Sequence, residues 1–333
     1  MSDTVVMTPT EIEAFAEEML VAAGTLPQNA APLARAIAAA ERDGIPSHGL
    51  MYLPTYMEHV RCGKVDGKAI PVVTTPKPGT VVVDAATGFA HPAIAAGFPA
   101  LVAAARTNGV AAMAVRNSYN CGVLGFHTEA IAVEGLLGIG FTNAPASIAP
   151  VGGKRPVIGT NPFSVAVPSG KRGASLLIDQ SASVVAKSEV MKRAREGEAI
   201  PEGWALGPDG EPTTDPAVGL KGSMAPAGGY KGFGIGLFTE IMAAALSGAT
   251  LGIDASPFSG TAGGPPKTGQ FFLAFDTDTP SGGAFSQRME ALSAAIEGAG
   301  DARLPGARRL AARAKSDAEG VRVKASQLEA IRN

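Results

Sequence analysis

The chain has 333 residues, a length that suggests about two domains. Hydrophobic residues make up 46% of it and charged residues 17%, which provides enough apolar material for a sizeable core and too little charge for a disordered chain. A net charge of −2 gives no basic surface for nucleic acid or anionic membrane, so we expect neither kind of partner.

The cysteines, histidines and N-terminus exclude further classes of protein. Cys62 and Cys121 are far apart and only four histidines occur, so we expect neither a disulfide scaffold nor a metal site. Residues 1–4 include an acidic residue where a signal peptide has basic residues, which argues against a signal peptide. The longest apolar run, 232–253, contains Glu240, which argues against a membrane span. These features predict a cytoplasmic protein without a membrane span.

The first 62 residues are predicted to be helical. Thr-Pro-Thr-Glu at 8–11 has the form of a capping box with proline at the first helical position, and apolar residues at helical spacing follow it. A second helix is expected to stop near Gly44, and a third follows it. Ser47-His48 lies between these two, at a predicted helix start.

From about residue 78 the pattern becomes mixed α/β. Short apolar runs between turn residues predict strands at 80–84, 110–115, 137–142, 163–167, 176–179 and 270–275. The segment 197–216 predicts a surface loop with the single Trp204, and 232–247 predicts one long helix. We expect a helical domain made of 1–75 with 284–333, and an α/β region at 76–283 that binds cofactor and substrate.

No sequence fingerprint marks a Rossmann fold. G-x-G-x-x-G between a strand and a helix is missing, and the glycine-rich run 232–236 follows a loop, where close helix packing explains its small residues more simply. The P-loop spacing is missing too.

His48 is the single residue whose chemistry stands out. An imidazole can give or take a proton near neutral pH, which reduction of a carbonyl or an imine requires. Ser47 beside it can orient the ring, and Glu189 could pair with it. The simpler alternatives stay open: Ser47 caps a helix while His48 only packs, and Glu189 is a solvated helix residue.

Four other segments could hold anions. Residues 116–122 follow a strand directly, where polar side chains and a helix start suit a phosphate or an amide. The turn 159–162 offers backbone N–H groups and the Thr160 hydroxyl to a carboxylate. Lys231 and the Arg308-Arg309 pair are cations suited to phosphate. An ordinary turn or a solvated surface explains each of them as well.

Five motifs occur together in the order seen in one family. They are Ser47-His48-Gly49, Gly159-Thr160-Asn161-Pro162, Ile200-Pro201-Glu202-Gly203-Trp204-Ala205, Pro212-Thr213-Thr214-Asp215-Pro216 and Gly228-Gly229-Tyr230-Lys231-Gly232. From about Thr8 to Ile331 the chain resembles the malate/L-lactate dehydrogenase family that lacks a Rossmann fold. That family also includes ureidoglycolate, sulfolactate and diketogulonate enzymes and reductases of cyclic imine carboxylates. The motifs are specific for the family and not for the substrate.

The resemblance implies a homodimer with an unusual α/β nicotinamide-binding domain, a mixed sheet, and helices from both chain ends packed together. It implies that His48 protonates the substrate with Ser47 and Glu189 as its relay, and that Tyr52 and Thr160 contact the substrate. The residues that would line NAD or NADP are Asn120, Cys121, Gly122, Val123, Leu124, Asp179, Gln180, Ser181, Lys187, Tyr230, Lys231, Pro305, Gly306, Arg308 and Arg309.

Three departures from the family pattern matter. Many relatives carry an arginine where this chain has Tyr52, and such an arginine can clamp a carboxylate bidentately. Asn120 stands where many have a histidine, which favours His48 as the proton donor. Gln-Ser-Ala at 180–182 replaces Met-Ala-Thr, which is expected to alter how the cofactor is held.

We expect an NAD(P)-dependent oxidoreductase that interconverts a 2-oxo acid and a 2-hydroxy acid, with hydride from the nicotinamide and a proton from His48. The alternative reaction is reduction of a cyclic imine 2-carboxylate of the pyrroline or piperideine type, because C=N can replace C=O in the same hydride geometry. A third interpretation is a non-catalytic binding protein on this scaffold, motivated by Tyr52 and Asn120. The residues leave the choice between NADH and NADPH open.

Overall fold

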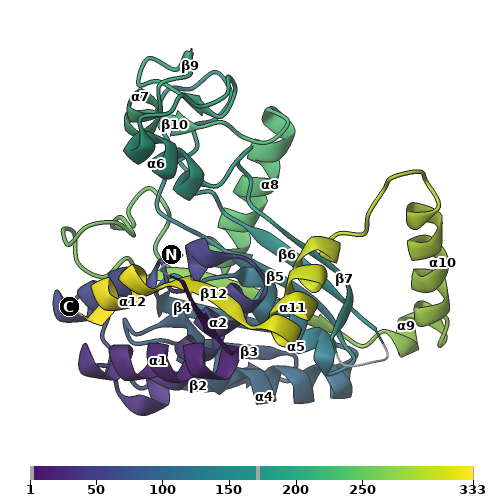
Figure 1. Ribbon diagram of the computed structural model, residues 1–333. Coiled ribbons are helices and arrows are strands. Elements are labelled where there is room, and N and C mark those ends of the chain that lie inside the picture. Colours follow the sequence, from purple (N-terminus) through teal and green to yellow (C-terminus); the bar gives the residue numbers. More distant parts are fainter. Residues whose placement is uncertain (1–3, 170–172, 333) are drawn as a thin grey trace.

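A computed structural model describes residues 4–169 and 173–332 and shows a seven-stranded mixed sheet at the centre of the body (Figure 1). Its strand order is β2-β3-β4-β11-β5-β6-β7, in which β3 and β4 are parallel and the other neighbours antiparallel. The strands are β2 (Val72–Lys77), β3 (Thr80–Asp84), β4 (Val110–Ser118), β5 (Leu137–Thr142), β6 (Phe163–Pro168), β7 (Ala174–Gln180) and β11 (Thr268–Phe275). The predicted mixed sheet is confirmed.

Both faces of this sheet are buried. On one face α4 (Ala90–Asn108) and α5 (Leu124–Val133) pack in a cluster that includes Phe272 of β11. On the other face Phe271 packs with Ala243, which lies in the segment after α8 (Tyr230–Glu240). Successive residues of a strand point to opposite faces, so the near-continuous apolar run of β11 serves both clusters.

The two chain ends meet on one side of the body. β1 (Thr4–Met7) pairs antiparallel with β12 (Val321–Lys324). The helices there are α1 (Pro9–Ala22), α2 (Pro27–Arg42), α3 (Leu53–Arg61), α11 (Ala307–Glu319) and α12 (Ala325–Arg332). One hydrophobic cluster joins Leu33 with Val323 and Ile331. The expected packing of helices from both ends is therefore present.

The N-terminal motif caps its helix as predicted. Thr8 Oγ1 accepts the Glu11 N–H at 3.2 Å, and Glu11 Oε2 accepts the Thr8 N–H at 2.7 Å. The domain division at 75 and 284 remains a prediction. After β11, α9 (Asp278–Ser281) and α10 (Phe285–Glu297) form a projecting arm, and α10 has no buried residue (Figure 1).

A small lobe stands above the body on α8 (Figure 1). It contains α6 (Lys187–Glu196), α7 (Pro216–Lys221) and a three-stranded sheet of β8 (Ala205–Leu206), β9 (Pro212–Thr213) and β10 (Ser223–Met224). The prediction of a surface loop at 197–216 was therefore wrong in part. Trp204 is half-buried against the core of the lobe, with the Arg193 guanidinium 5.7 Å from its ring centroid. Strands of two residues are too short for an alternating pattern to reveal.

The single long helix predicted at 232–247 is two helical segments in the structure. α8 ends at Glu240, and a π-helix, η2 (Ile241–Leu246), continues it. The Ser247 hydroxyl donates to the Ala243 carbonyl near the end of this turn. Apolar residues occur throughout both segments, so the sequence pattern does not separate them. In the two described ranges, no helix combines the length and the apolar character that a membrane crossing needs.

Candidate active site

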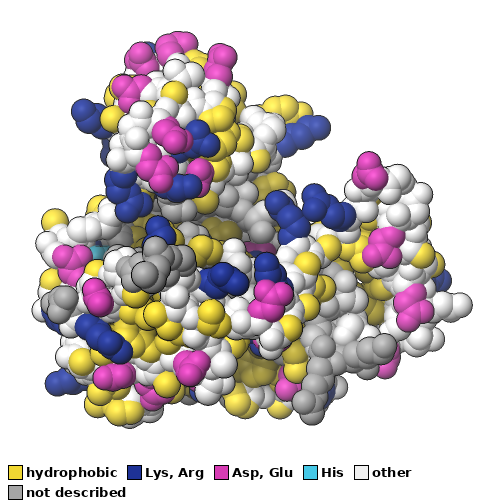
Figure 2. All heavy atoms as spheres, viewed as in Figure 1, with side chains coloured by type: hydrophobic (Ala, Val, Ile, Leu, Met, Phe, Trp, Pro, Cys, Tyr) yellow, Lys and Arg dark blue, Asp and Glu magenta, His cyan; other side chains and the backbone are white. Residues whose placement is uncertain are grey.

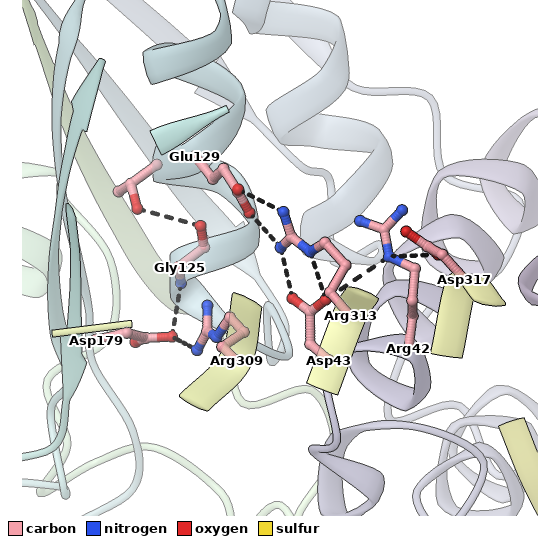
Figure 3. Close-up of polar contacts among 9 residues, drawn as sticks. Arg42, Asp43, Gly125, Glu129, Asp179, Arg309, Arg313 and Asp317 are labelled. Atoms are coloured by element: carbon pink, nitrogen blue, oxygen red, sulfur yellow. Dashed lines mark hydrogen bonds and ion pairs between the residues drawn. The ribbon is translucent and has the colours of Figure 1, made fainter. Parts of the chain in front are cut away.

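The site is built where β7 ends and where α5 and α11 begin (Figure 3). Asp179, near the end of β7, accepts the Gly125 N–H at 3.0 Å and pairs with Arg309 Nη2 at 2.7 Å. Pro305 accepts the Leu177 N–H at 3.1 Å, which fixes the entry to α11 against the same strand. A carboxylate at the start of α5 is favoured by the helix dipole, and Arg309 balances its charge.

His48 lies in a separate 3-10 turn, η1 (Pro46–His48), before the start of α3, so the predicted helix start at Ser47 is a distinct turn. Ser47 Oγ is 3.1 Å from His48 Nδ1. Burial lowers the pKa of His48, while the negative charge of Asp179 raises it and the positive charge of Arg309 lowers it. The ion pair on β7 and α11 therefore acts electrostatically on the imidazole.

Glu189 lies apart from this arrangement of contacts. It is a half-buried residue of α6 in the small lobe, and its carboxylate pairs with Arg193 at 3.5 Å. The carboxylate whose charge acts on His48 is that of Asp179. The structure thus brings together Ser47, His48, Asp179 and Arg309, and the relay through Glu189 stays a prediction.

The loop before α5 presents its backbone rather than its side chains. Asn120 Oδ1 accepts the Gly122 N–H at 2.6 Å, and Gly122 has φ +65°, where a side chain would be strained. Cys121 and Leu124 are buried in the core beneath the loop. Burial raises the pKa of the Cys121 thiol to about 12, so it stays protonated at neutral pH. Of the predicted cofactor residues here, these two can contribute only main-chain groups.

Backbone bonds join three of the sequence motifs. The Ala182 N–H donates to the Thr160 carbonyl at 2.8 Å, and the Ala227 N–H donates to the Ala182 carbonyl at 2.8 Å. Thr160 is therefore adjacent to Gln180 and Ser181, and the start of α8 is close to the same segment. Tyr230 and Lys231 are exposed at that start, as are Lys187 on α6 and Arg308 on α11.

The two departures at Tyr52 and Asn120 are neighbours in space. Burial raises the pKa of the Tyr52 hydroxyl, and hydrogen bonds with the Tyr119 and Asn120 side chains lower it. The Tyr52 hydroxyl also donates to the Phe258 carbonyl at 3.2 Å. Tyr52 therefore hydrogen-bonds both to the loop that carries Phe258 and to the loop before α5. No sequence pattern indicates that these two side chains are in contact.

These residues fit a nicotinamide dinucleotide. Arg309 Nη1 is buried and finds no hydrogen-bond partner in the described part of the chain, although Nη2 of the same guanidinium is paired. Gly228 and Gly229 have positive φ and open space around them, beside Lys231. Figure 2 shows Lys and Arg side chains around the hollow between the small lobe and the body. Backbone N–H groups at 123–124 with Arg308, Arg309 and Lys231 would hold the phosphates. Among the described residues, no group of three or more His, Cys, Asp or Glu could hold a metal ion.

Comparison with known proteins identifies the family. The family model described as malate/L-lactate dehydrogenase matches residues 7–332. The chain belongs to the malate/L-lactate dehydrogenase family. The resemblance found in the sequence is thereby confirmed, and with it the expectation of an NAD(P)-dependent oxidoreductase.

Within this family, the chain is 44% identical over 305 residues to the (2R)-3-sulfolactate dehydrogenase (NADP(+)) of Chromohalobacter salexigens, covering 91% of this chain and 90% of the relative. It is 37% identical to the Δ1-pyrroline-2-carboxylate reductase of Ancylobacter novellus, covering 98% and 96%. Among solved structures, the Δ1-piperideine-2-carboxylate reductase of Pseudomonas syringae pv. tomato superposes with a TM-score of 0.93 at 35% identity, covering 98% of each chain. The non-Rossmann α/β fold is thus the fold of this family.

The electrostatic contact between Asp179 and His48 can be measured directly. We expect Asp179→Asn to lower the pKa of His48, because the negative charge that raises it is removed and the charge of Arg309 is left unbalanced. NMR titration of histidine ring carbons, with His48→Gln to assign the signal, gives this value. Glu189→Gln is the matched control, since Glu189 pairs with Arg193 and should leave the titration unchanged. A larger fall in the control would favour the relay through Glu189.

Proposed function

We propose that the protein interconverts a 2-oxo acid and a 2-hydroxy acid with NAD or NADP, and that His48 supplies the proton. The observation that carries this proposal is the Ser47–His48 pair beside the Asp179–Arg309 ion pair, next to the segments that fit the dinucleotide. The similarity to a sulfolactate dehydrogenase that uses NADP(+) supports it.

The cofactor, when bound, supplies or accepts the hydride. His48 donates its proton to the carbonyl oxygen, and its lowered pKa makes the protonated ring a readier acid. Ser47 holds Nδ1 and thereby directs the other ring nitrogen. Thr160 and Tyr52 contact the substrate. Closure of the small lobe over the hollow would exclude water from these groups.

A second reaction has its own support. The solved Δ1-piperideine-2-carboxylate reductase superposes along nearly the whole chain, so the fold of this chain is compatible with reduction of a cyclic imine carboxylate. In this case His48 would protonate nitrogen rather than oxygen.

A substrate panel decides between the two reactions. Loss of reduced-nicotinamide absorbance is followed with purified protein on 2-oxo acids, including sulfopyruvate, and on pyrroline and piperideine 2-carboxylates, with NADH and NADPH separately. We expect turnover of a 2-oxo acid. Turnover of the imines alone would replace the leading proposal by the second one, and no turnover of either class would refute both.

The role of His48 predicts a selective kinetic loss. We expect His48→Gln to lower kcat by about 100- to 10,000-fold, as for loss of a general acid, and to leave the dissociation constant of the cofactor unchanged. Ser47→Ala removes only the 3.1 Å contact to Nδ1 and should cost less. Cofactor affinity is measured by fluorescence titration of NAD(P)H. If kcat survives in His48→Gln, another group donates the proton.

We also propose that the protein is a homodimer. Apolar side chains that are 38–59% exposed form a face along α8, η2 and the loop that follows, and a second copy of the chain would cover it. They are Ile235, Leu237, Phe238, Ile241, Leu246, Leu251 and Ile253.

Sedimentation velocity tests the homodimer. We expect twice the chain mass of 33.5 kDa, and a shift to monomer for Phe238→Glu. Leu292→Glu is the control, since Leu292 is 51% exposed on the separate helix α10. A monomer in the unmodified protein would contradict the proposal. A cytoplasmic location is proposed as well, because reduced nicotinamides are available there, and cell fractionation tests it.

A further inference from the structure

A buried carboxylate lies beneath the turn that carries Thr160. Glu240, the last residue of α8, is 6% exposed and forms no ion pair among the described residues. Its Oε1 accepts the Gly252 N–H at 2.7 Å and Asn143 Nδ2 at 3.4 Å, and its Oε2 accepts Asn161 Nδ2 at 2.7 Å. Burial of a charge without a counter-ion costs free energy unless N–H groups donate hydrogen bonds to it. All three donors therefore stabilise the Glu240 carboxylate.

Asn161 transmits this contact to the turn. Its side chain is fully buried, and it accepts the Ala144 N–H at 3.1 Å and donates to the Gly236 carbonyl at 3.0 Å. Its φ of +37° is unusual for a residue other than glycine, so neighbouring contacts must hold it there. A Cβ at Gly159 would lie 2.3 Å from the Ala144 carbonyl oxygen, which shows how closely the turn is packed.

The helix around Glu240 has two different sides. Thr239 and Glu240 are buried, whereas Phe238 and Ile241 are 48% and 49% exposed on the proposed dimer face. The π-helix η2 begins at Ile241, and such turns often occur at functional sites. Glu240 therefore hydrogen-bonds to Asn161 in the turn 159–162, and it is next in sequence to an exposed residue of the proposed dimer face.

We propose that Glu240 is a positioning residue that sets the Thr160 turn for the substrate, acting through Asn161. This inference rests on the proposed function for the substrate contact of Thr160. The bond from the Ala182 N–H to the Thr160 carbonyl reports on the turn independently of activity.

Glu240→Gln tests the proposal, because its NH₂ group must face either Asn161 Nδ2 or the Gly252 N–H, both of which are donors. We expect the KM for the substrate to rise about tenfold or more, since a displaced turn no longer orients it. The dissociation constant of NADPH should stay within about twofold. Amide exchange at Ala182 should accelerate about tenfold, while exchange at Leu177, bonded to Pro305, stays unchanged.

Two further variants separate positioning from general damage. Thr239→Val removes a buried hydroxyl that has no hydrogen-bond partner in the described ranges, and it should leave KM and exchange unchanged. Asn161→Asp combined with Glu240→Gln restores a donor and an acceptor between these two side chains. The Gly236 carbonyl then loses its donor, so we expect only part of both effects to be recovered. The double variant decides the matter if the single one does not fold.

Unchanged KM and unchanged Ala182 exchange in Glu240→Gln would overturn the inference. A rise in the dissociation constant of NADPH as large as the rise in KM would also overturn it. The same changes in KM and in Ala182 exchange in Thr239→Val would overturn it as well. A double variant that folds but recovers neither the KM nor the Ala182 exchange rate would also contradict the inference. If the unmodified protein turns over no substrate, the proposed function fails, and amide exchange alone still tests the coupling of Glu240 to the turn.

Discussion

The guanidinium of Arg313 attaches α11, which carries Arg309 of the site, to α2 and α5 of the body. It donates to both oxygens of Asp43, at the end of α2, and to both oxygens of Glu129 on α5, with all four distances at 2.7–2.8 Å (Figure 3). The contact lowers the pKa of Glu129 against the effect of its burial. Loss of one partner of a buried ion pair typically costs about 3–5 kcal/mol, because the remaining charge is left without compensation. α11 is thus fixed to the body, and Arg309, one turn before Arg313, reaches Asp179.

The strands and the family could be predicted from the sequence because local patterns encode them. β3 and β5 match the predicted ranges 80–84 and 137–142, where apolar runs end at clear turn residues. The capping box at Thr8 is likewise local in sequence. By contrast, β1 and β12 are stabilised by pairing with each other across the whole chain, and no local signal marks such a partner. The π-helix η2 has the same composition as the helix before it.

The candidate site shows the same limit. Single residues such as His48 and Asp179 could be named, since their chemistry is visible in their type and position. Their contacts could not, because they depend on side chains that are far apart in the chain, such as Asp179 and Arg309, which are separated by 130 residues. The neighbouring positions of Tyr52 and Asn120 belong to this class.

The pairing of the two chain ends has a consequence for synthesis on the ribosome. Arg309 lies close to the C-terminus, and β12 and α12 follow it. The central sheet can pair while the last segments are still inside the exit tunnel, but β1 must wait for β12, and Asp179 must wait for Arg309. The body then exists for a time with a carboxylate and an edge strand unpaired. Until α11 has folded against the body, Asp179 acts on His48 without the balancing charge of Arg309.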